Sequence, residues 1–308
     1  MPREHEQIVW DQRLEDDLRH LVRLAIREDL GRTQDWTTVS LVPAGVKGQA
    51  AAVTRADGVV AGMLAGQVVL DEMETDAGWQ PQIDDGDSVT AGTTLAMIEG
   101  SARDLLTAER TILNIMGRLS GIATLTRRYV DAIAGTRARI CDTRKTTPAW
   151  RRLEKFAVRC GGGLNHRTGL FDAVLIKDNH LAYYGHQATT PTPADAVMQA
   201  RRFVSACDAI VNKSDFIIEI EVDSLDQLRN ALSANPDIVL LDNMDADQMR
   251  SAVAVRDELA PDCELEASGG VTLQTVASIA ATGVERISVG ALTHSATSLD
   301  VGLDWSDR

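Results

Sequence analysis

The chain has 308 residues, of which 44% are hydrophobic and 25% charged, and its formal net charge is −14. This length allows one large α/β domain or two domains, and the composition is that of an ordinary globular protein. The acidic balance and the low aromatic content of 4% argue against nucleic-acid binding, which uses broad basic surfaces and stacking aromatic side chains.

The amino-terminal residues Met-Pro-Arg-Glu-His-Glu-Gln lack the apolar core of a signal peptide, and no apolar run reaches membrane-spanning length. The four cysteines, Cys141, Cys160, Cys207 and Cys263, lack zinc-ligand spacing and show no disulfide pattern. We therefore expect a cytoplasmic protein with reduced thiols and no membrane partner.

Apolar residues recur at helical spacing from Leu14 to Ile26, which predicts an amphipathic helix ending near Gly31. Residues 35–38 then resemble a turn and cap. Short strands are predicted at 50–54, 59–62 and 94–99, with a helix over 67–73 between them. The acidic segment 84–88 is interpreted as a solvated turn, because it lacks the ligand spacing of a calcium loop. Together these features predict a small α+β domain.

Ser101 and Asp104 form a capping pair that predicts the start of a long helix, and a second helix is expected over roughly 122–134. Arg110 lies on a stripe away from the apolar face of the long helix. Gly117 and Gly121 would allow another backbone to approach closely.

Beyond residue 135 the sequence alternates strand-like and helix-like stretches. The predicted strands are 138–142, 173–177, 217–222, 238–241, 264–267 and 286–289, and the predicted helices are 193–205, 224–234, 246–259 and 273–281. Strands that alternate with helices indicate a parallel sheet, and in a β/α barrel the carboxyl ends of the strands carry the active site. Polar residues or glycines follow every predicted strand: Thr143, Arg144, Lys145, Lys177, Glu221, Asp242, Asn243, Ser268, Gly269, Gly270 and Gly290.

A cationic segment, residues 137–167, contains nine basic and two acidic residues, a local balance of +7. Such a cluster in an acidic protein suits a small, strongly anionic ligand. Arg144 and Arg167 can donate two parallel hydrogen bonds to a carboxylate or phosphate, whereas Lys145 and Lys177 act as point charges. Three further basic residues of this segment are interpreted as a solvated helix face, namely Arg151, Arg152 and Lys155.

The glycines at 268–270 and 290 follow the last two predicted strands, where barrels often bind phosphate through backbone N–H groups. Glu221 and Asp242 have two interpretations: they are ion-pair partners of the nearby cations, or they are ligands of Mg²⁺. His166 is expected to remain neutral, because neighbouring cations disfavour its protonation. His180 is expected to orient a loop.

Seven motifs in this order resemble the quinolinate phosphoribosyltransferase family. They are Glu-Arg-Thr-Ile-Leu-Asn at 109–114, Asp-Thr-Arg-Lys-Thr-Thr-Pro at 142–148, Gly-Gly-Gly-Leu-Asn-His-Arg at 161–167, Ile-Lys-Asp-Asn-His at 176–180, Leu-Asp-Asn at 241–243, Ser-Gly-Gly at 268–270 and Val-Gly-Ala-Leu-Thr-His at 289–294. The sequence departs from the family pattern at Ala149-Trp150, where a Gly-Leu pair is usual, and at Phe171, where a small residue is usual.

The resemblance implies an α/β fold: an open, incomplete barrel of parallel strands over 114–292, and a smaller α+β sandwich domain over 1–113 that the tail 293–308 rejoins. It implies transfer of a phosphoribosyl group from phosphoribosyl pyrophosphate to quinolinate with decarboxylation, giving nicotinate mononucleotide, pyrophosphate and CO₂ in the de novo synthesis of NAD. It also implies a homodimer, or a higher multiple of dimers, in which Arg110 enters the partner's site.

The resemblance also implies roles for individual residues. Lys145, Lys177, Glu221 and Asp242 are the expected catalytic residues. Mg²⁺ is the expected cofactor, held by Glu221 and Asp242. The expected substrate-binding residues are Arg110, Thr143, Arg144, His166, Arg167, Asn243, Ser268, Gly269, Gly270, Gly290 and His294, the last five around the 5-phosphate.

Three alternatives remain at this point. A molybdenum-associated group of related proteins shares the arginine-lysine motif, but the intact Ile-Lys-Asp-Asn-His at 176–180 disfavours it. A Schiff-base aldolase would use Lys177 as its nucleophile, which leaves the anion-binding cluster without a purpose. A non-catalytic nucleotide-binding module would not need the carboxylates Glu221 and Asp242.

Overall fold

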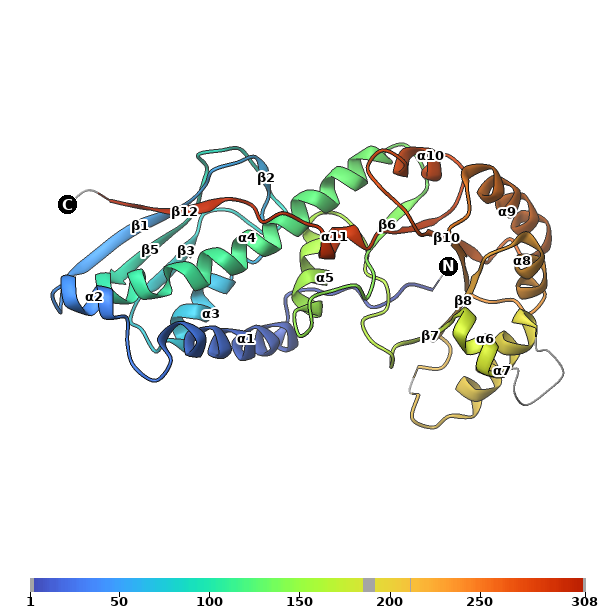
Figure 1. Ribbon diagram of the computed structural model, residues 1–308, viewed down its shortest axis with the longest axis horizontal. Coiled ribbons are helices and arrows are strands. Elements are labelled where there is room, and N and C mark those ends of the chain that lie inside the picture. Colours follow the sequence, from blue (N-terminus) through green and yellow to red (C-terminus); the bar gives the residue numbers. More distant parts are fainter. Residues whose placement is uncertain (1–2, 185–191, 211, 307–308) are drawn as a thin grey trace. The chain divides into compact units, whose positions relative to one another are not determined.

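The computed structural model describes residues 3–184, 192–210 and 212–306 (Figure 1). The chain divides into two compact units. We call residues 1–7, 128–144 and 164–291 the barrel unit, and residues 8–127, 145–163 and 292–308 the antiparallel unit. In the described part of the chain, no helix has both the length and the apolar character needed to cross a membrane.

The barrel unit contains one sheet of six parallel strands. These are β6 (Arg139–Cys141), β7 (Ala173–Ile176), β8 (Ile217–Val222), β9 (Ile238–Asp242), β10 (Glu264–Ser268) and β11 (Arg286–Ser288), in the order β6-β11-β10-β9-β8-β7. Among the described strands no pairing joins β6 to β7, so the sheet is open. The predicted α/β class, the parallel strands and the incomplete barrel are all confirmed.

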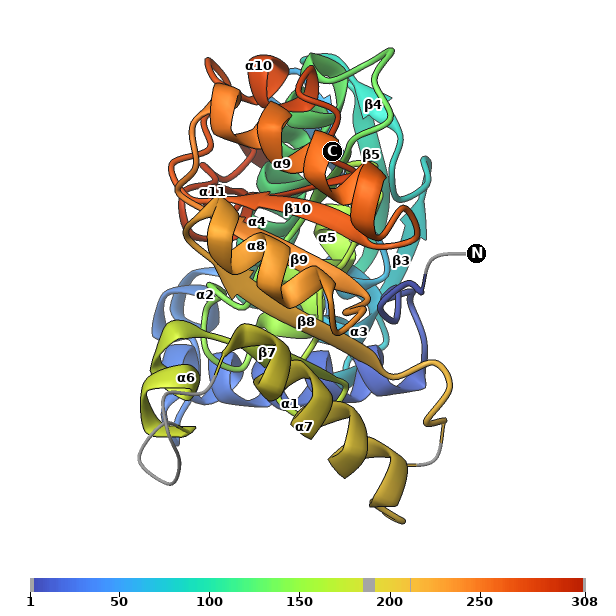
Figure 2. The same cartoon turned by 90° about the vertical axis from the view of Figure 1, so that its right-hand side faces the viewer.

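Helices connect these strands and cover the outer face of the sheet. They are α6 (Asp178–Tyr184), α7 (Pro193–Ala206), α8 (Leu225–Leu232), α9 (Ala246–Leu259) and α10 (Val276–Ala280). In Figure 2, α7, α8 and α9 lie side by side along the strands. Each of the three begins at a residue whose side chain caps the first turn, namely Thr192, Ser224 and Asp245. Their apolar faces bury Val197, Leu228 and Met249.

The antiparallel unit is built on a second sheet, with the strand order β12-β1-β5-β3 (Figure 1). Its strands are β1 (Lys47–Thr54), β3 (Gly78–Pro81), β5 (Thr94–Ser101) and β12 (Val301–Trp305), and a separate short pair joins β2 (Gly58–Val59) to β4 (Ser88–Val89). The last strand, β12, pairs antiparallel with β1, from Ala50 opposite Trp305 to Thr54 opposite Val301. The return of the carboxyl-terminal tail to this sheet is therefore confirmed.

The helices of the antiparallel unit are α1 (Gln12–Leu30), α2 (Trp36–Leu41), α3 (Ala65–Glu72) and α5 (Arg151–Cys160), and the short α11 (Ala291–His294) precedes the tail. Gly31 ends α1 with φ 59°, as predicted for its C-cap. The segment 35–38 is more than a turn, because Asp35 caps α2 by accepting a hydrogen bond from the Thr38 N–H at 3.0 Å.

One helix, α4 (Ala102–Ala132), replaces the two helices predicted over this region, and the predicted domain boundary at 113/114 lies inside it. Gly117 and Gly121 do not interrupt the helix. A Cβ on Gly121 would lie 2.1 Å from the Thr297 carbonyl oxygen, and the Leu299 N–H donates to the Gly117 carbonyl at 2.9 Å. The closely packed backbone is therefore the chain's own tail, so these glycines give no support for a partner subunit.

One expectation about charged residues is wrong, and a second, the solvated turn at 84–88, holds except at Asp85. Lys155 is fully buried, as is its neighbour Glu154, so this part of α5 is not a solvated face. The Glu154 carboxylate accepts hydrogen bonds from Arg118 at 2.6 Å and from the Thr147 hydroxyl at 2.9 Å. Asp85 is not simply solvated either: its carboxylate accepts the backbone N–H groups of Gly62 and Met63, and its burial raises its pKa.

Both departures from the family pattern have structural consequences. Ala149 occupies the left-handed region with φ 67°, a conformation that glycine adopts more easily than alanine. Phe171 is 76% exposed, and its ring lies over Gly169, where a Cβ would come within 2.4 Å of the ring. The exposed Phe171 ring thus occupies the space beside Gly169.

Candidate functional site

The predicted site residues of the barrel unit lie at one edge of the parallel sheet. Because all six strands run in the same direction, their carboxyl ends meet at this edge. The register places Ser268 of β10 beside Asp242 of β9, and the Asn243 N–H donates to the Ser268 carbonyl at 3.0 Å. We call this edge the rim.

Lys177, directly after β7, pairs with Glu221 near the end of β8. The lysine side chain is 42% exposed and the glutamate side chain 15% exposed, so the pair is open to solvent on one side. The Lys177 backbone N–H donates to His180 Nδ1 at 2.9 Å, which confirms that His180 orients this loop. Of the two interpretations of Glu221, the structure shows the ion pair.

The rim at β9 and β10 is a tight backbone turn. Asn243 has φ 54°, and Gly269 and Gly270 have φ 93° and 61°. A Cβ on Gly269 would lie 2.1 Å from the Asn243 side-chain oxygen, so only glycine fits there. The Asn243 amide donates to the Asp242 carboxylate at 2.9 Å, which fixes that carboxylate at the strand end. The predicted polar and glycine residues are thus brought together as expected.

Arg144 and Arg167 form the cationic part of the rim. The segment containing Arg167 is held beside β6, because the Leu164 N–H donates to the Ile140 carbonyl and Leu164 forms a parallel bridge with Cys141. Arg167 is only 7% exposed and forms no ion pair with a carboxylate in the described part of the chain. Burial lowers its pKa, and repulsion from Arg144 lowers it further. Such a site favours an incoming anion.

His166 is buried beneath this rim, with 5% of its surface exposed. Its Nδ1 accepts the backbone N–H of Arg167 at 2.7 Å, and its Nε2 lies 3.0 Å from Glu219 and 3.5 Å from Glu266. The neutral ring therefore carries its proton on Nε2. Burial alone would lower the pKa of His166, but the two carboxylates raise it above its ordinary value. The expectation that nearby cations disfavour protonation is wrong, because the carboxylates lie closer.

A buried ionic cluster fills the interior of the sheet towards the amino ends of its strands. Arg286 is fully buried and donates to Glu266 at 2.8 Å, while Glu264 pairs with Arg139. The Ser288 hydroxyl donates to Glu266 as well. Burial opposes the charge on Arg286, but these carboxylates raise its pKa. In this cluster most charged side chains are paired with a side chain of opposite charge.

Sequence reasoning did not identify this cluster, although the sequence contained a sign of it. Charged or polar residues alternate with apolar ones in Glu219-Ile220-Glu221, in Glu264 to Ser268 and in Arg286 to Ser288. In a strand, residues two apart face the same side, so on these three strands a buried charged residue lies beneath the polar residue nearer the rim: Glu219 beneath Glu221, Glu266 beneath Ser268 and Arg286 beneath Ser288. Helix-covered parallel strands are usually apolar on both faces, which makes this alternation informative.

Three donor atoms, from His5, His166 and Glu219, lie within 4.8 Å of one another, a spacing that a metal site requires. The two imidazole rings, however, are stacked, with centroids 4.6 Å apart and planes inclined by 24°. Their lone pairs lie in nearly parallel planes and do not converge on one point. This arrangement is a stack and not a metal centre.

Three predicted residues belong to the antiparallel unit. Arg110 on α4 is 74% exposed, and it lines a cavity of about 350 Å³ within that unit, together with Asn114, Gly117 and residues 298–301. Lys145 and His294 are exposed. Lys145 follows Arg144 directly in the chain, and its carbonyl accepts the Thr293 hydroxyl at 2.7 Å.

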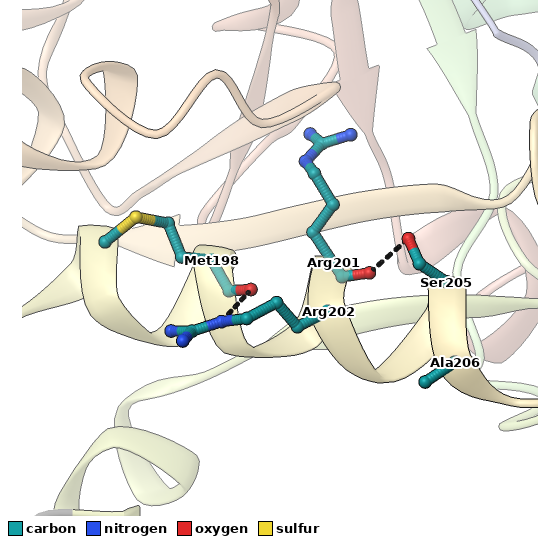
Figure 3. Close-up of a pocket in the computed structure, with 5 residues that line it drawn as sticks. All are labelled: Met198, Arg201, Arg202, Ser205 and Ala206. Atoms are coloured by element: carbon teal, nitrogen blue, oxygen red, sulfur yellow. Dashed lines mark hydrogen bonds between the residues drawn. The ribbon is translucent and has the colours of Figure 1, made fainter.

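A further concave surface, of about 670 Å³, lies along α7 and contains no predicted site residue. Figure 3 shows its lining residues on this single helix, where Arg202 donates to the Met198 carbonyl and the Ser205 hydroxyl donates to the Arg201 carbonyl. Its lining residues offer no carboxylate, and one of its two arginines, Arg201, donates to the Asn235 carbonyl at 2.6 Å. The rim is therefore the better candidate site.

Comparison with known proteins gives matches over most of the chain. Residues 35–120 and 122–304 match the family described as quinolinate phosphoribosyl transferase, in its N-terminal and C-terminal domains respectively. The chain is 45% identical over 291 residues to a nicotinate-nucleotide pyrophosphorylase (carboxylating) of Mycobacterium leprae, covering 94% of this chain and 97% of that protein.

It is also 35% identical over 302 residues to a quinolinate phosphoribosyltransferase (decarboxylating) of Nicotiana tabacum, covering 93% of this chain and 82% of that one. Among solved structures, the nicotinate-nucleotide pyrophosphorylase from Francisella tularensis superimposes with a TM-score of 0.86 at 34% identity, covering 98% of this chain and 100% of that chain.

Proposed function

The chain belongs to the quinolinate phosphoribosyl transferase family, and on that premise we propose that the rim residues carry out its reaction. The chain is a pentosyltransferase that joins quinolinate to phosphoribosyl pyrophosphate with decarboxylation, a step in the de novo synthesis of NAD. The observation that best supports the proposed site is the buried Arg167, which lies beside Arg144 and pairs with no carboxylate among the described residues.

Quinolinate carries two adjacent carboxylates. In our proposal Arg144 and Arg167 bind them. His166 lies beneath the two arginines and positions Arg167, because its Nδ1 accepts the Arg167 backbone N–H. Lys177 and Lys145 supply further positive charge, and Thr143 contributes a hydroxyl beside Arg144. Binding relieves the repulsion between the two guanidinium groups, so the dianion fits this rim better than a monoanion does.

The phosphoribosyl group is assigned to the opposite part of the rim. Ser268, Gly269 and Gly270 precede α10, and a backbone in which two successive residues have positive φ exposes N–H groups to a 5-phosphate. Gly290, after β11, and His294 are assigned to the same phosphate, while Asn243 holds Asp242 in place.

We assign Mg²⁺ to Asp242 and Glu221. The donor set fits, because both are carboxylates at neighbouring strand ends and Mg²⁺ completes its coordination with water and substrate phosphate. Glu221 also has a charge partner, so its carboxylate can exchange Lys177 for a ligand without being left unpaired. When bound, the ion neutralises the charge that develops on departing pyrophosphate.

These residues allow the reaction to be written as a sequence of bond changes. The quinolinate ring nitrogen forms a bond to the anomeric carbon while the bond from that carbon to the pyrophosphate oxygen breaks. The electron pair leaves with pyrophosphate, near Lys177. The ring is then an electron-poor pyridinium, and loss of the adjacent carboxylate as CO₂ leaves an electron pair that takes up a proton. Charge complementarity at the rim stabilises both changes.

The aldolase alternative finds no support in the site geometry. A Schiff-base lysine must have its amine free to attack a carbonyl, whereas the Lys177 amine is held in an ion pair with the Glu221 carboxylate. Borohydride reduction in the presence of substrate should therefore trap no adduct on Lys177. A reduced adduct on this residue would restore the aldolase interpretation.

We also propose that the active form is a homodimer in which each site receives Arg110 from the partner subunit. The exposed Arg110 side chain beside a cavity of its own unit supports this assignment. Arg110→Ala and Lys177→Ala should each be nearly inactive. After subunit exchange, an equal mixture should regain roughly a quarter of wild-type sites, because half the dimers are mixed and each mixed dimer has one intact site. No recovery would mean that Arg110 acts within its own chain.

The deciding experiment compares quinolinate with nicotinate as acceptor of the phosphoribosyl group. A rim built for two carboxylates leaves a buried arginine unpaired when it binds nicotinate, and such mismatches cost about 10⁴ in kcat/KM. We expect nicotinate mononucleotide formation from quinolinate and almost none from nicotinate. Comparable rates would contradict the proposed site. The cytoplasmic location expected from the sequence stays a prediction.

A further inference from the structure

The N-terminal arm, defined here as residues 3–7, belongs to the barrel unit although the residues after it do not. Its Glu4 carboxylate pairs with Arg139 at the start of β6 and, at 3.2 Å, with Arg286 at the start of β11. The arm therefore joins the buried ionic cluster from the amino ends of the strands, the side opposite the rim.

Two further contacts fix the arm on either side of Glu4. Arg3 pairs with Asp237, directly before β9. Gln7 makes two hydrogen bonds to the backbone of Asn165, accepting its N–H at 2.9 Å and donating to its carbonyl at 3.2 Å. Such paired side-chain-to-backbone bonds hold a segment in one register. The arm is thus connected directly to the residue that precedes His166.

Between these anchors, His5 lies against the face of the His166 ring. The ring centroids are 4.6 Å apart, the planes are inclined by 24°, and each residue is 5% exposed. The edges of the His166 ring are already fixed: Nδ1 accepts the Arg167 N–H, and Nε2 faces Glu219. His5 adds a contact to the face of the His166 ring. This contact restricts rotation of the His166 ring about its Cβ–Cγ bond.

The charged groups around His166 come from several elements of the barrel unit. Glu219 on β8 and Glu266 on β10 face its Nε2, and Arg286 on β11 lies behind Glu266. Asp142, after β6, accepts the His166 backbone N–H at 2.9 Å. Removal of the His5 ring would open space for water beside these groups, and water would weaken every one of these electrostatic interactions.

We propose that His5 is a positioning residue for quinolinate binding: the N-terminal arm, anchored at the amino ends of the strands, holds the His5 ring against His166 and so fixes His166 for the substrate. This inference rests on the proposed role of His166 at the rim. Residues 3–7 lie outside both ranges that match the family, 35–120 and 122–304.

The test compares His5→Ala with wild type and with His20→Ala. The control removes an exposed histidine of α1 whose ring contacts the Asp16 carbonyl. We expect His5→Ala to lower kcat/KM for quinolinate roughly three- to tenfold, the effect of losing one aromatic stack, with KM for phosphoribosyl pyrophosphate within about twofold of wild type. His5→Phe retains a stacked ring and should recover most of the loss.

A second measurement does not depend on turnover. The ring carbon-bound protons of His166, assigned by their absence in His166→Gln, are followed by NMR as a function of pH. We expect His5→Ala to displace this titration and His20→Ala to leave it in place. Unchanged titration and kcat/KM in His5→Ala, or equal losses for both substrates, would overturn the inference.

The two proposals fail in different ways. If wild type does not turn over quinolinate, the proposed function is wrong, while the NMR titration still reports on His5 and His166. If His5→Ala does not fold, His5→Leu replaces it, since leucine fills the space without a planar ring. A loss for quinolinate in His5→Leu but not in His5→Phe supports the inference, and equal behaviour of the two variants contradicts it.

Discussion

Two arginines of the barrel unit, Arg286 in the buried ionic cluster and Arg167 at the rim, show how one residue type serves opposite purposes. Both are buried, at 0% and 7% exposure. Arg286 contacts the carboxylates of Glu266, Glu264 and Glu4, which raise its pKa. Arg167 forms no ion pair within the described residues, and its pKa is lowered. The protein supplies the counter-charge in the first case, and in our proposal quinolinate supplies it in the second.

The same contrast appears within a single strand. Glu219 and Glu221 are two residues apart on β8 and therefore point to the same side. Glu219 is fully buried against His166, whereas Glu221 at the rim pairs with the half-exposed Lys177. A pair that is partly in water exchanges partners at little cost, but a buried pair does not. Depth in the sheet thus separates fully buried charges from charges that are open to solvent.

The largest effect is expected from Arg286→Met, which leaves the carboxylates of the buried ionic cluster without their shared cation. Breaking a buried ion pair in this way costs about 3–5 kcal/mol of stability. Urea denaturation measures the free energy of unfolding, and Arg250→Met, which removes an exposed partner of Asp247, is the matched control. A variant as stable as this control would show that the cluster does not hold the unit together.

Arg167→Met should give the opposite pattern. Loss of a buried charge partner of quinolinate should cost about 2–5 kcal/mol of transition-state stabilisation in kcat/KM. The free energy of unfolding should change little or rise, because a buried cation without a counter-charge is removed. Steady-state kinetics and urea denaturation on the same preparation test both parts. A large loss of stability would remove the distinction between Arg167 and Arg286.

A smaller effect is expected from the proposed metal ligand at the rim. Asp242→Asn should raise KM for phosphoribosyl pyrophosphate by at least about tenfold and affect quinolinate binding less, because the carboxylate organises Mg²⁺ and phosphate. Excess chelator should abolish activity of the wild type, and added Mg²⁺ should restore it. Full activity in chelator would contradict the metal assignment.

The smallest effect is a pH dependence of stability that His166 contributes. Its pKa is raised in the folded state, so between the unfolded and folded pKa values the folded chain binds more protons than the unfolded chain. The contribution is full below the unfolded pKa of about 6.5 and is lost as the pH rises through the folded value. Denaturation curves from pH 5 to 9 should show a fall that Glu219→Gln diminishes. If the stability that His166 contributes instead rises with pH, the predicted sign is wrong.

The sequence was sufficient for every strand of the parallel sheet and for the rim. Short apolar runs, each followed by a polar residue or glycine, predict β6 to β11 within one or two residues, because alternation with helices is a local property of the chain. The motifs at Arg144, Arg167 and Lys177 were likewise read from contiguous residues. The short strands β3 and β4 were not predicted, since their four and two residues carry too little periodicity.

Only the tertiary structure decided which charges are satisfied. The contacts of Glu4 with Arg286 and of His5 with His166 join residues more than 150 positions apart, so no local pattern reports them. No local pattern reports that Gly117 and Gly121 pack against the chain's own tail either. Local propensity specifies an element and the direction of its side chains. Which groups a side chain contacts depends on sheet register and packing, and in the barrel unit those contacts separate Arg286, which is paired with carboxylates, from Arg167, which we propose binds quinolinate.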